Sequence, residues 1–291
     1  MPNLKEVKTR ISSVTSTRQI TKAMKMVAAA KLRRAQDNII QMRPYAEKLG
    51  EILANVSQGL GKDEGNEFGI VREEESILII AITSDRGLCG AFNSNIGKRV
   101  VNLIGKSYSS QHQRGDVQVL VIGTKGRDYF TSRGYKVIDT FVSAFSDLSF
   151  ESVKGAAEFA MNGFKNSEFD KVDIVYNEFK NIATQVIRTQ NYLPLIASDS
   201  EGSTTAIDYI YQPNKSTLVT EIIPKSLKIQ LYKAVLESFA SEHGARMTAM
   251  EKATENATDL LRDLQITYNR TRQAAITKEI LEIVAGAEAL S

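Results

Sequence analysis

The sequence predicts an α/β fold. It combines a long antiparallel two-helix coiled coil, formed by the N- and C-terminal helices, with an inserted Rossmann-like α/β domain. Three observations lead to this prediction: apolar residues recur with a period of seven at both chain ends, strands alternate with helices in the middle, and glycine- and acid-rich stretches separate these parts. The expected segments are an N-terminal helix at 1–58, a linker at 59–76, an α/β domain at 77–212 and a C-terminal helix at 213–291.

The C-terminal stretch 225–285 contains no proline and only one glycine, Gly244. As a single α-helix it would be about 90 Å long, too long for one globular core. Its apolar positions form a narrow stripe: Met250, Ala257, Leu261, Leu264, Tyr268 and Ala275. Such a stripe is typical of a coiled-coil seam, so this helix requires a long partner.

The N-terminal helix is expected to supply that partner, because its apolar residues follow one heptad register. These residues are Leu4, Val7, Ile11, Val14, Leu32, Ala35, Ile39, Met42, Leu49, Leu53 and Val56. Between Val14 and Leu32 the seam positions hold Arg18, Thr21, Lys25 and Ala28, whereas Ile20, Met24 and Val27 lie off the seam. We therefore expect part of this surface to face away from the C-terminal helix. Pro44 is expected to bend the helix without ending it.

The middle of the chain reads as a mainly parallel sheet with helices between its strands. The segment 59–75 is rich in glycine and acid, which predicts an exposed, mobile linker. Strands are expected at 77–83, 117–123, 135–142, 172–179 and 184–195, with helices near 92–108, after 123 and at 150–165. Only four residues, KNIA, join the last two strands, which favours an antiparallel hairpin at the sheet edge. Pro213 and Pro224 are expected to precede the C-terminal helix.

Composition excludes several classes of protein. Hydrophobic residues make up 42% and charged residues 24%, which is typical of a soluble protein, and no apolar run is long enough to cross a membrane. The basic N-terminus could be read as an organellar transit peptide, but its heptads continue unbroken into the N-terminal helix, which favours a part of the mature structure. One cysteine, Cys89, and two histidines, His112 and His243, do not make a typical zinc site, so no metal or cofactor is expected.

Charge is unevenly placed along the chain. Residues 1–43 hold ten lysines and arginines against two acids, a net charge of +8 within a chain whose total is +3. This pattern fits a solvated helix face or an acidic partner. A basic arm that binds nucleic acid is the weaker alternative, since no aromatic residue interleaves with the basic ones before Tyr45.

An enzyme is the main alternative from another functional class. The turn at 84–90, SDRGLCG, follows a buried strand and precedes a helix, where α/β folds often place ligands. Backbone amides there could hold a phosphate, and Cys89 at a helix start could have a lowered pKa. The turn matches neither common phosphate-binding motif, and no histidine is near it in sequence, so a structural turn is favoured.

The last residues of the chain are unusually apolar. Eight of the twelve residues from Ile280 to Ser291 are hydrophobic, including Ile283 and Leu290, and they point all round the helix. Such an end is unlike a coiled-coil seam, which favours insertion into an apolar collar. Just before it, Arg272 and Gln273 offer a guanidinium and an amide suited to carboxylate contacts.

Four stretches resemble the gamma-subunit family of F-type ATP synthases: ITKAMKMVAAAKLRRAQ (20–36), TSDRGLCGAFN (83–93), SEHGARMTAMEKATENA (241–257) and YNRTRQAAITKEILEIVAGAEAL (268–290). The resemblance runs in order along the whole chain, and the two terminal stretches are highly specific to that family. It implies a non-catalytic rotor shaft that passes rotation of the membrane proteolipid ring to the catalytic alpha/beta hexamer. It also implies a position on the cytoplasmic face of a bacterial inner membrane, attached only through the complex.

The resemblance also implies contact residues. Met24 and Arg246 match shaft positions that pass the catalytic subunits, and Arg272 with Gln273 matches the pair that meets a loop of the beta subunit. Ile280 to Leu290, including Ile283, resembles the tip inside the hexamer. Tyr209 and Tyr211 match the region near the epsilon subunit and the proteolipid c-ring.

Overall fold

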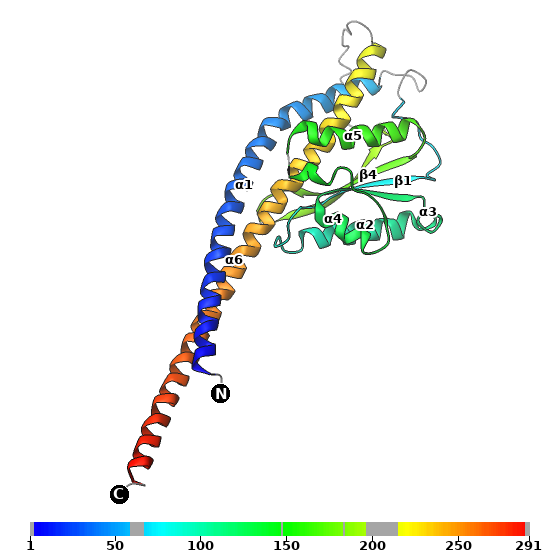
Figure 1. The fold of residues 1–291 in the computed structure, drawn as a ribbon. Helices are drawn as coiled ribbons and strands as arrows, with labels where there is room; N and C mark the ends of the chain where they lie inside the picture. Colours follow the sequence, from blue (N-terminus) through cyan, green and yellow to red (C-terminus); the bar gives the residue numbers. More distant parts are fainter. Residues whose placement is uncertain (1–2, 59–66, 147, 183, 196–214, 289–291) are drawn as a thin grey trace. The chain divides into compact units, whose positions relative to one another are not determined.

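The fold is seen in a computed structural model (Figure 1), which describes residues 3–58, 67–146, 148–182, 184–195 and 215–288. The chain divides into two compact units. The coiled-coil unit contains Met1–Ala29 and Arg246–Ser291, and the sheet unit contains Ala30–Ala245. Both boundaries fall inside the terminal helices, so the four-segment division expected from the sequence stays a prediction.

The two long helices expected at the chain ends are present. Helix α1 spans Leu4–Gln58 and continues through Pro44, and helix α6 spans Lys215–Glu288. The expectation that Pro224 precedes the C-terminal helix is wrong, because this proline lies inside α6. A proline removes one helix hydrogen bond and crowds the preceding turn. Ile223 and Leu227, on either side of it, are 4% and 1% exposed, so their burial holds the helix through the proline.

Two polar pairs fix the register of α1 and α6 in the coiled-coil unit. Thr21 Oγ1 lies 2.8 Å from Thr254 Oγ1, and the Lys25 ammonium pairs with the Glu251 carboxylate. The residue numbers of the two pairs add to 275 and 276, as antiparallel helices require. The predicted seam is confirmed, because its buried residues include Val7 and Ala28 of α1 and Met250, Ala257 and Leu261 of α6.

Helix α6 extends beyond the end of α1. The same register places Leu4, the first residue of α1, opposite residue 271 or 272. Residues 272–287 of α6, the overhang, are all exposed. Ala275 was expected in the seam and is exposed, because it lies beyond the first residue of α1 and has no α1 residue opposite it.

The sheet unit contains five strands in the order β3-β2-β1-β4-β5. Their bounds are Ile77–Ile82 for β1, Val117–Ile122 for β2, Lys136–Ile138 for β3, Lys171–Phe179 for β4 and Gln185–Leu193 for β5. All neighbouring strands are parallel except β4 and β5. The mainly parallel sheet and its antiparallel edge hairpin are therefore confirmed. The third strand is shorter than predicted, and a 3-10 turn at Val142–Phe145 follows it.

Helices cover both faces of this sheet (Figure 1). One face packs against α2 (Phe92–Ser107) and α4 (Thr124–Thr131), next to the short helix α3 (Ser109–Arg114). The other face packs against α5 (Phe150–Lys165) and the first part of α6. The six residues of β1 are fully buried, as expected for a central strand covered on both sides.

Within the sheet unit, α6 is buried on two sides. Leu231 and Val235 belong to the core shared with the sheet and α5. Leu236 and Ala240 pack against Leu32, Ala35 and Ile39 of α1. A helix that is apolar on two sides must be covered on both. This segment of α6 therefore lies between α1 and the sheet.

Residues 67–76, in the predicted linker, contain no helix or strand and six of the ten are exposed, but two of their side chains are anchored on the sheet unit. Residues 59–66 lie outside the described residues. Phe68 is 5% exposed and belongs to the sheet core, and its carbonyl accepts a 2.7 Å hydrogen bond from the Leu195 amide. The Arg72 guanidinium lies over the Phe164 ring and donates to the Phe164 carbonyl. Glycine and acid content suggested a solvated chain, but these few side chains anchor the segment.

Candidate functional site

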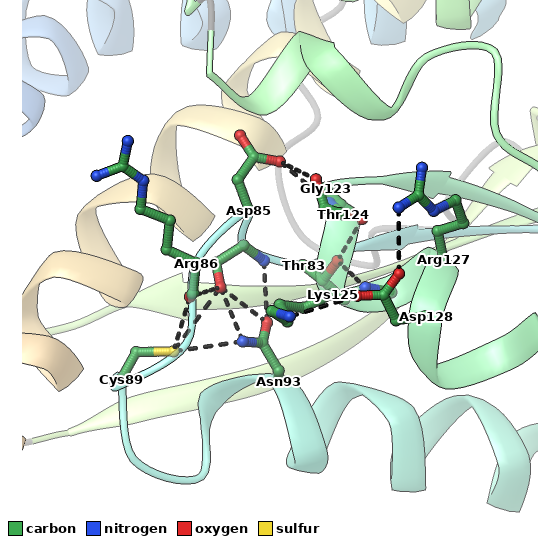
Figure 2. A network of polar contacts seen from close by, with 12 residues as sticks. Thr83, Asp85, Arg86, Cys89, Asn93, Gly123, Thr124, Lys125, Arg127 and Asp128 are labelled. Carbon is green, nitrogen blue, oxygen red and sulfur yellow. Dashed lines mark hydrogen bonds and ion pairs between the residues drawn. The ribbon is translucent and has the colours of Figure 1, made fainter. Parts of the chain in front are cut away.

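The turn after β1 is held by its own polar groups (Figure 2). Thr83 Oγ1 accepts a 2.8 Å hydrogen bond from the Gly126 amide at the start of α4. A Cβ at Gly123 would lie 2.2 Å from the Thr83 carbonyl oxygen, and one at Gly126 would lie 2.6 Å from Thr83 Oγ1. Glycine at these two positions lets the β1 and β2 ends approach closely.

The Asp85 side chain of this turn is bonded to the start of α4. The Asp85 carboxylate accepts hydrogen bonds from the Thr124 amide at 3.0 Å and the Thr124 hydroxyl at 3.2 Å. This carboxylate therefore occupies the N-terminus of α4, where a phosphate would otherwise bind. In this respect the geometry favours a structural turn over a ligand site.

The Cys89 thiol lies inside the same network. It is 1% exposed and accepts a 3.3 Å hydrogen bond from Asn93 Nδ2. The side-chain oxygen of Asn93 in turn accepts a hydrogen bond from the Ser84 amide. Leu88 and Gly90 take the left-handed conformation, with φ of 64° and 60°, which turns the chain back toward α2. A buried, bonded thiol is poorly placed to attack a substrate. No cluster of potential metal ligands occurs in the described part of the chain.

The contact residues expected on the shaft differ in accessibility. Met24 is half-buried, and the neighbouring Ile20 and Val27 are 59% and 58% exposed, so this face of α1 is open as predicted. Arg246 is only 8% exposed. Lys25 points to Glu251 across the seam, so this part of the basic segment is neutralised within the chain.

The overhang presents the remaining expected residues to the surroundings. Arg272 and Gln273 are exposed, and Ile280 and Ile283 are 55% and 71% exposed. Leu290, Tyr209 and Tyr211 lie outside the described residues. The roles expected for all these side chains stay predictions.

Sequence reasoning missed a group of buried ionisable residues on α6. Glu237, Glu242 and His243 are 7%, 3% and 4% exposed. Burial, and secondly the Lys31 ammonium, lowers the pKa of His243 to about 4. Burial also raises the pKa of Glu237, against the opposing effect of nearby cations such as Lys233. The unbroken helical pattern of α6 gave no sign that these side chains face inward.

No helix in the described segments is both long enough and apolar enough to span a membrane.

A family model described as ATP synthase matches residues 3–290. The chain belongs to this family. Curated members named ATP synthase gamma chain are 54% identical in Cytophaga hutchinsonii, over 294 residues, and 53% identical in Flavobacterium johnsoniae, over 291 residues; each match covers 100% of both chains.

Solved structures agree with the ATP synthase family assignment. One chain from the central stalk and c-ring structure of the Tetrahymena thermophila mitochondrial ATP synthase is 25% identical, with a TM-score of 0.58 over 80% of this chain and 99% of that one. A chain of the Euglena gracilis mitochondrial ATP synthase is 23% identical, with a TM-score of 0.69 over 99% of this chain and 94% of that one. The Euglena likeness shows the shared fold.

Proposed function

We propose that this chain is the gamma subunit of an F-type ATP synthase and acts as its central rotor shaft. It transmits rotation of the proteolipid c-ring to the catalytic alpha/beta hexamer, so that ion flow drives ATP synthesis or ATP hydrolysis drives ion flow. The observation that carries this proposal is full-length similarity to gamma chains together with a coiled coil ending in an exposed apolar overhang. The chain itself has a non-catalytic role in the complex and a part in regulating its ATPase activity.

The proposed mechanism rests on the asymmetry of the coiled coil. The faces of α1 and α6 differ: an apolar seam interrupted by the Thr21–Thr254 pair, an open apolar face around Met24, and exposed basic residues such as Lys22 and Arg33. A rotating shaft of this kind presents a different face to each catalytic site in turn. The conformational equilibrium of each catalytic site shifts only by the difference between the contact free energies of those faces. One charge crossing 100 mV releases about 2.3 kcal/mol, so the shaft must accumulate the energy of several ions.

The proposed contacts follow the expected residues. Met24 and Arg246 pass the catalytic subunits, Arg272 and Gln273 meet a loop of the beta subunit, and the tip with Ile280, Ile283 and Leu290 turns inside the hexamer. Tyr209 and Tyr211 lie near the epsilon subunit and the c-ring. The chain is placed on the cytoplasmic face of the bacterial inner membrane and is held there only through the complex.

Co-purification tests this function. Extraction of membranes with a mild detergent, followed by capture of an affinity-tagged chain, should bring down ATP hydrolase activity with the alpha, beta, epsilon and c subunits. An untagged strain is the control. Recovery of the tagged chain alone, while the ATP-hydrolysing complex stays in the unbound fraction, would overturn the proposal.

A further inference from the structure

The sheet changes direction between β1 and β4. The chain proceeds from β1 to β2 and β3 on one side, and β4 and β5 lie on the other side. In open α/β sheets, ligands bind in the crevice outside the carboxyl ends of the two strands at such a reversal. In this chain the crevice lies beyond Ile82 of β1 and near Asn177 of β4.

Asn177 pairs with Ile187 of β5 on one side, but on the side of β1 it has no strand partner at this crevice. The β1–β4 ladder ends at the pair Ala81 and Val175, two residues before Asn177. Helix α6 supplies the missing partners: Ser238 Oγ accepts a hydrogen bond from the Asn177 amide at 3.4 Å, and the Ser241 hydroxyl donates to the Asn177 carbonyl at 3.0 Å. Asn177 is 3% exposed, and both serines are fully buried.

These two contacts differ in kind from the apolar contacts of the same interface, which also holds one further hydrogen bond, from the Tyr192 hydroxyl of β5 to the Leu227 carbonyl of α6 at 3.0 Å. Leu231 and Val235 contribute apolar burial, which has little directional preference. Hydrogen bonds require a defined distance and angle, so the two serines, with the Tyr192 contact earlier in the helix, fix how far α6 is turned about its own axis and where it lies along the strand. The loss of either hydroxyl would leave a buried backbone group without this partner.

We infer that α6 occupies the crevice in which α/β folds bind ligands, and that Ser238 and Ser241 clamp it to Asn177 so that rotation passes from the sheet into the helix. This inference rests on the proposed function. The sheet unit receives the torque, and α6 carries it onward because the helix runs unbroken to Glu288. The serines are positioning residues that act by holding the helix.

The test uses membrane vesicles that contain the whole complex with the double variant Ser238→Ala and Ser241→Ala. ATP hydrolysis and ATP-driven ion uptake are measured on the same vesicles. Because each hydrogen bond shifts an equilibrium by up to about tenfold, the ratio of ion uptake to hydrolysis should fall by about two- to tenfold. Hydrolysis itself should continue, since the catalytic sites are untouched.

Val235→Ala is the matched control, because it removes apolar contact from the same helix without removing a hydroxyl. The full-length chains are also unfolded in urea to compare their stability. The inference is supported if the serine variant loses coupling while Val235→Ala, with an equal or larger loss of stability, keeps it. Equal coupling in the serine variant and the wild type, or equal losses in both variants, would overturn the clamp. Either result leaves the proposed function standing, because co-purification of the chain is scored separately.

Discussion

At the scale of single residues, His243 shows how burial decides chemistry in α6. Its ring lies against Phe239, with centroids 4.3 Å apart, and it is 4% exposed. The charged form of a histidine is disfavoured in such a place. The same environment acts in the opposite sense on Glu237, whose neutral form is favoured.

The first prediction concerns acid stability. The pKa of His243 in the folded chain, about 4, lies below the ordinary 6.5, so its contribution is complete above pH 6.5 and is lost as the pH falls toward 4. At about 1.4 kcal/mol per pKa unit, this loss amounts to roughly 3 kcal/mol. His243→Gln should flatten the fall of unfolding free energy between pH 6.5 and 4 in urea titrations. His112→Gln, at an exposed histidine, is the matched control for the loss of a histidine side chain.

The second prediction has the opposite sign. The folded-state pKa of Glu237 is raised, so a stability penalty appears as the pH rises above the ordinary 4.5 and through the folded value. Arg43 from α1, Lys233 from α6, and Glu178 and Arg188 from the sheet are the charged groups that act on it. Glu237→Gln should therefore raise the unfolding free energy at pH 8 by about 1 kcal/mol and have little effect at pH 4. A destabilised variant at pH 8 would show that the ionised carboxylate is well paired.

At the scale of elements, the apolar seam between α1 and α6 contains a polar pair, Thr21 and Thr254. One of the two hydroxyls donates to the other, and the hydroxyl that accepts can donate its own proton to a carbonyl of its helix, that of Arg18 for Thr21 or that of Met250 for Thr254. When one threonine is replaced, the hydroxyl of the other stays in the seam and loses a hydrogen-bond partner, which costs free energy. The pair therefore favours one register over its neighbours by a few tenths to about one kcal/mol.

The third prediction tests this pair by a double-mutant cycle. Thr21→Val alone should lower the unfolding free energy by about 1 kcal/mol, while Thr21→Val with Thr254→Val should recover much of that loss. Thr17→Val is the control, because the exposed Thr17 hydroxyl bonds only to its own helix. Circular dichroism during urea unfolding measures five chains: the wild type, Thr21→Val, Thr254→Val, the double variant and the Thr17→Val control. Additive losses in the double variant would contradict a direct Thr21–Thr254 interaction.

The elements show what sequence patterns can and cannot predict. Buried strands such as 77–82 and the helix at 150–165 follow from local apolar runs and caps, including the Ser149 cap of α5. Pro224 and Phe68 were misread, because local composition does not reveal that distant core residues hold them in place. The contact of Asn177 with Ser238 and Ser241 could not be predicted, since it depends on where α6 lies along the sheet.

At the scale of the whole molecule, one helix, α6, takes part in the sheet core, in the coiled coil and in the overhang. Helix α6 contributes to the sheet core near Leu231, to the coiled-coil seam near Ala257, and ends in the overhang. The apolar residues of the overhang find no cover among the described residues, which fits a role only within a larger assembly.

The fourth prediction separates folding from assembly. Ile280→Ser with Ile283→Ser should change the unfolding free energy of the isolated chain by less than about 0.5 kcal/mol, since both side chains are exposed. The same variant should lower ATP synthesis in membrane vesicles, because it would remove the apolar contacts with the hexamer that we propose for the tip. Ile182→Ser, at an exposed isoleucine of the sheet unit, is the matched control and should leave synthesis unchanged. A large loss of stability in the isolated chain would show that the tip packs against its own protein.

The end of α1 near residue 271 of α6 has a mechanical consequence. Two helices packed about 8–10 Å apart resist bending far more than one helix does. Bending rigidity must therefore drop abruptly at this level, and elastic deformation concentrates in the last turns of the rod. A surrounding sleeve that grips those turns would act as a bearing, keeping straight the one stretch that the chain leaves unbraced.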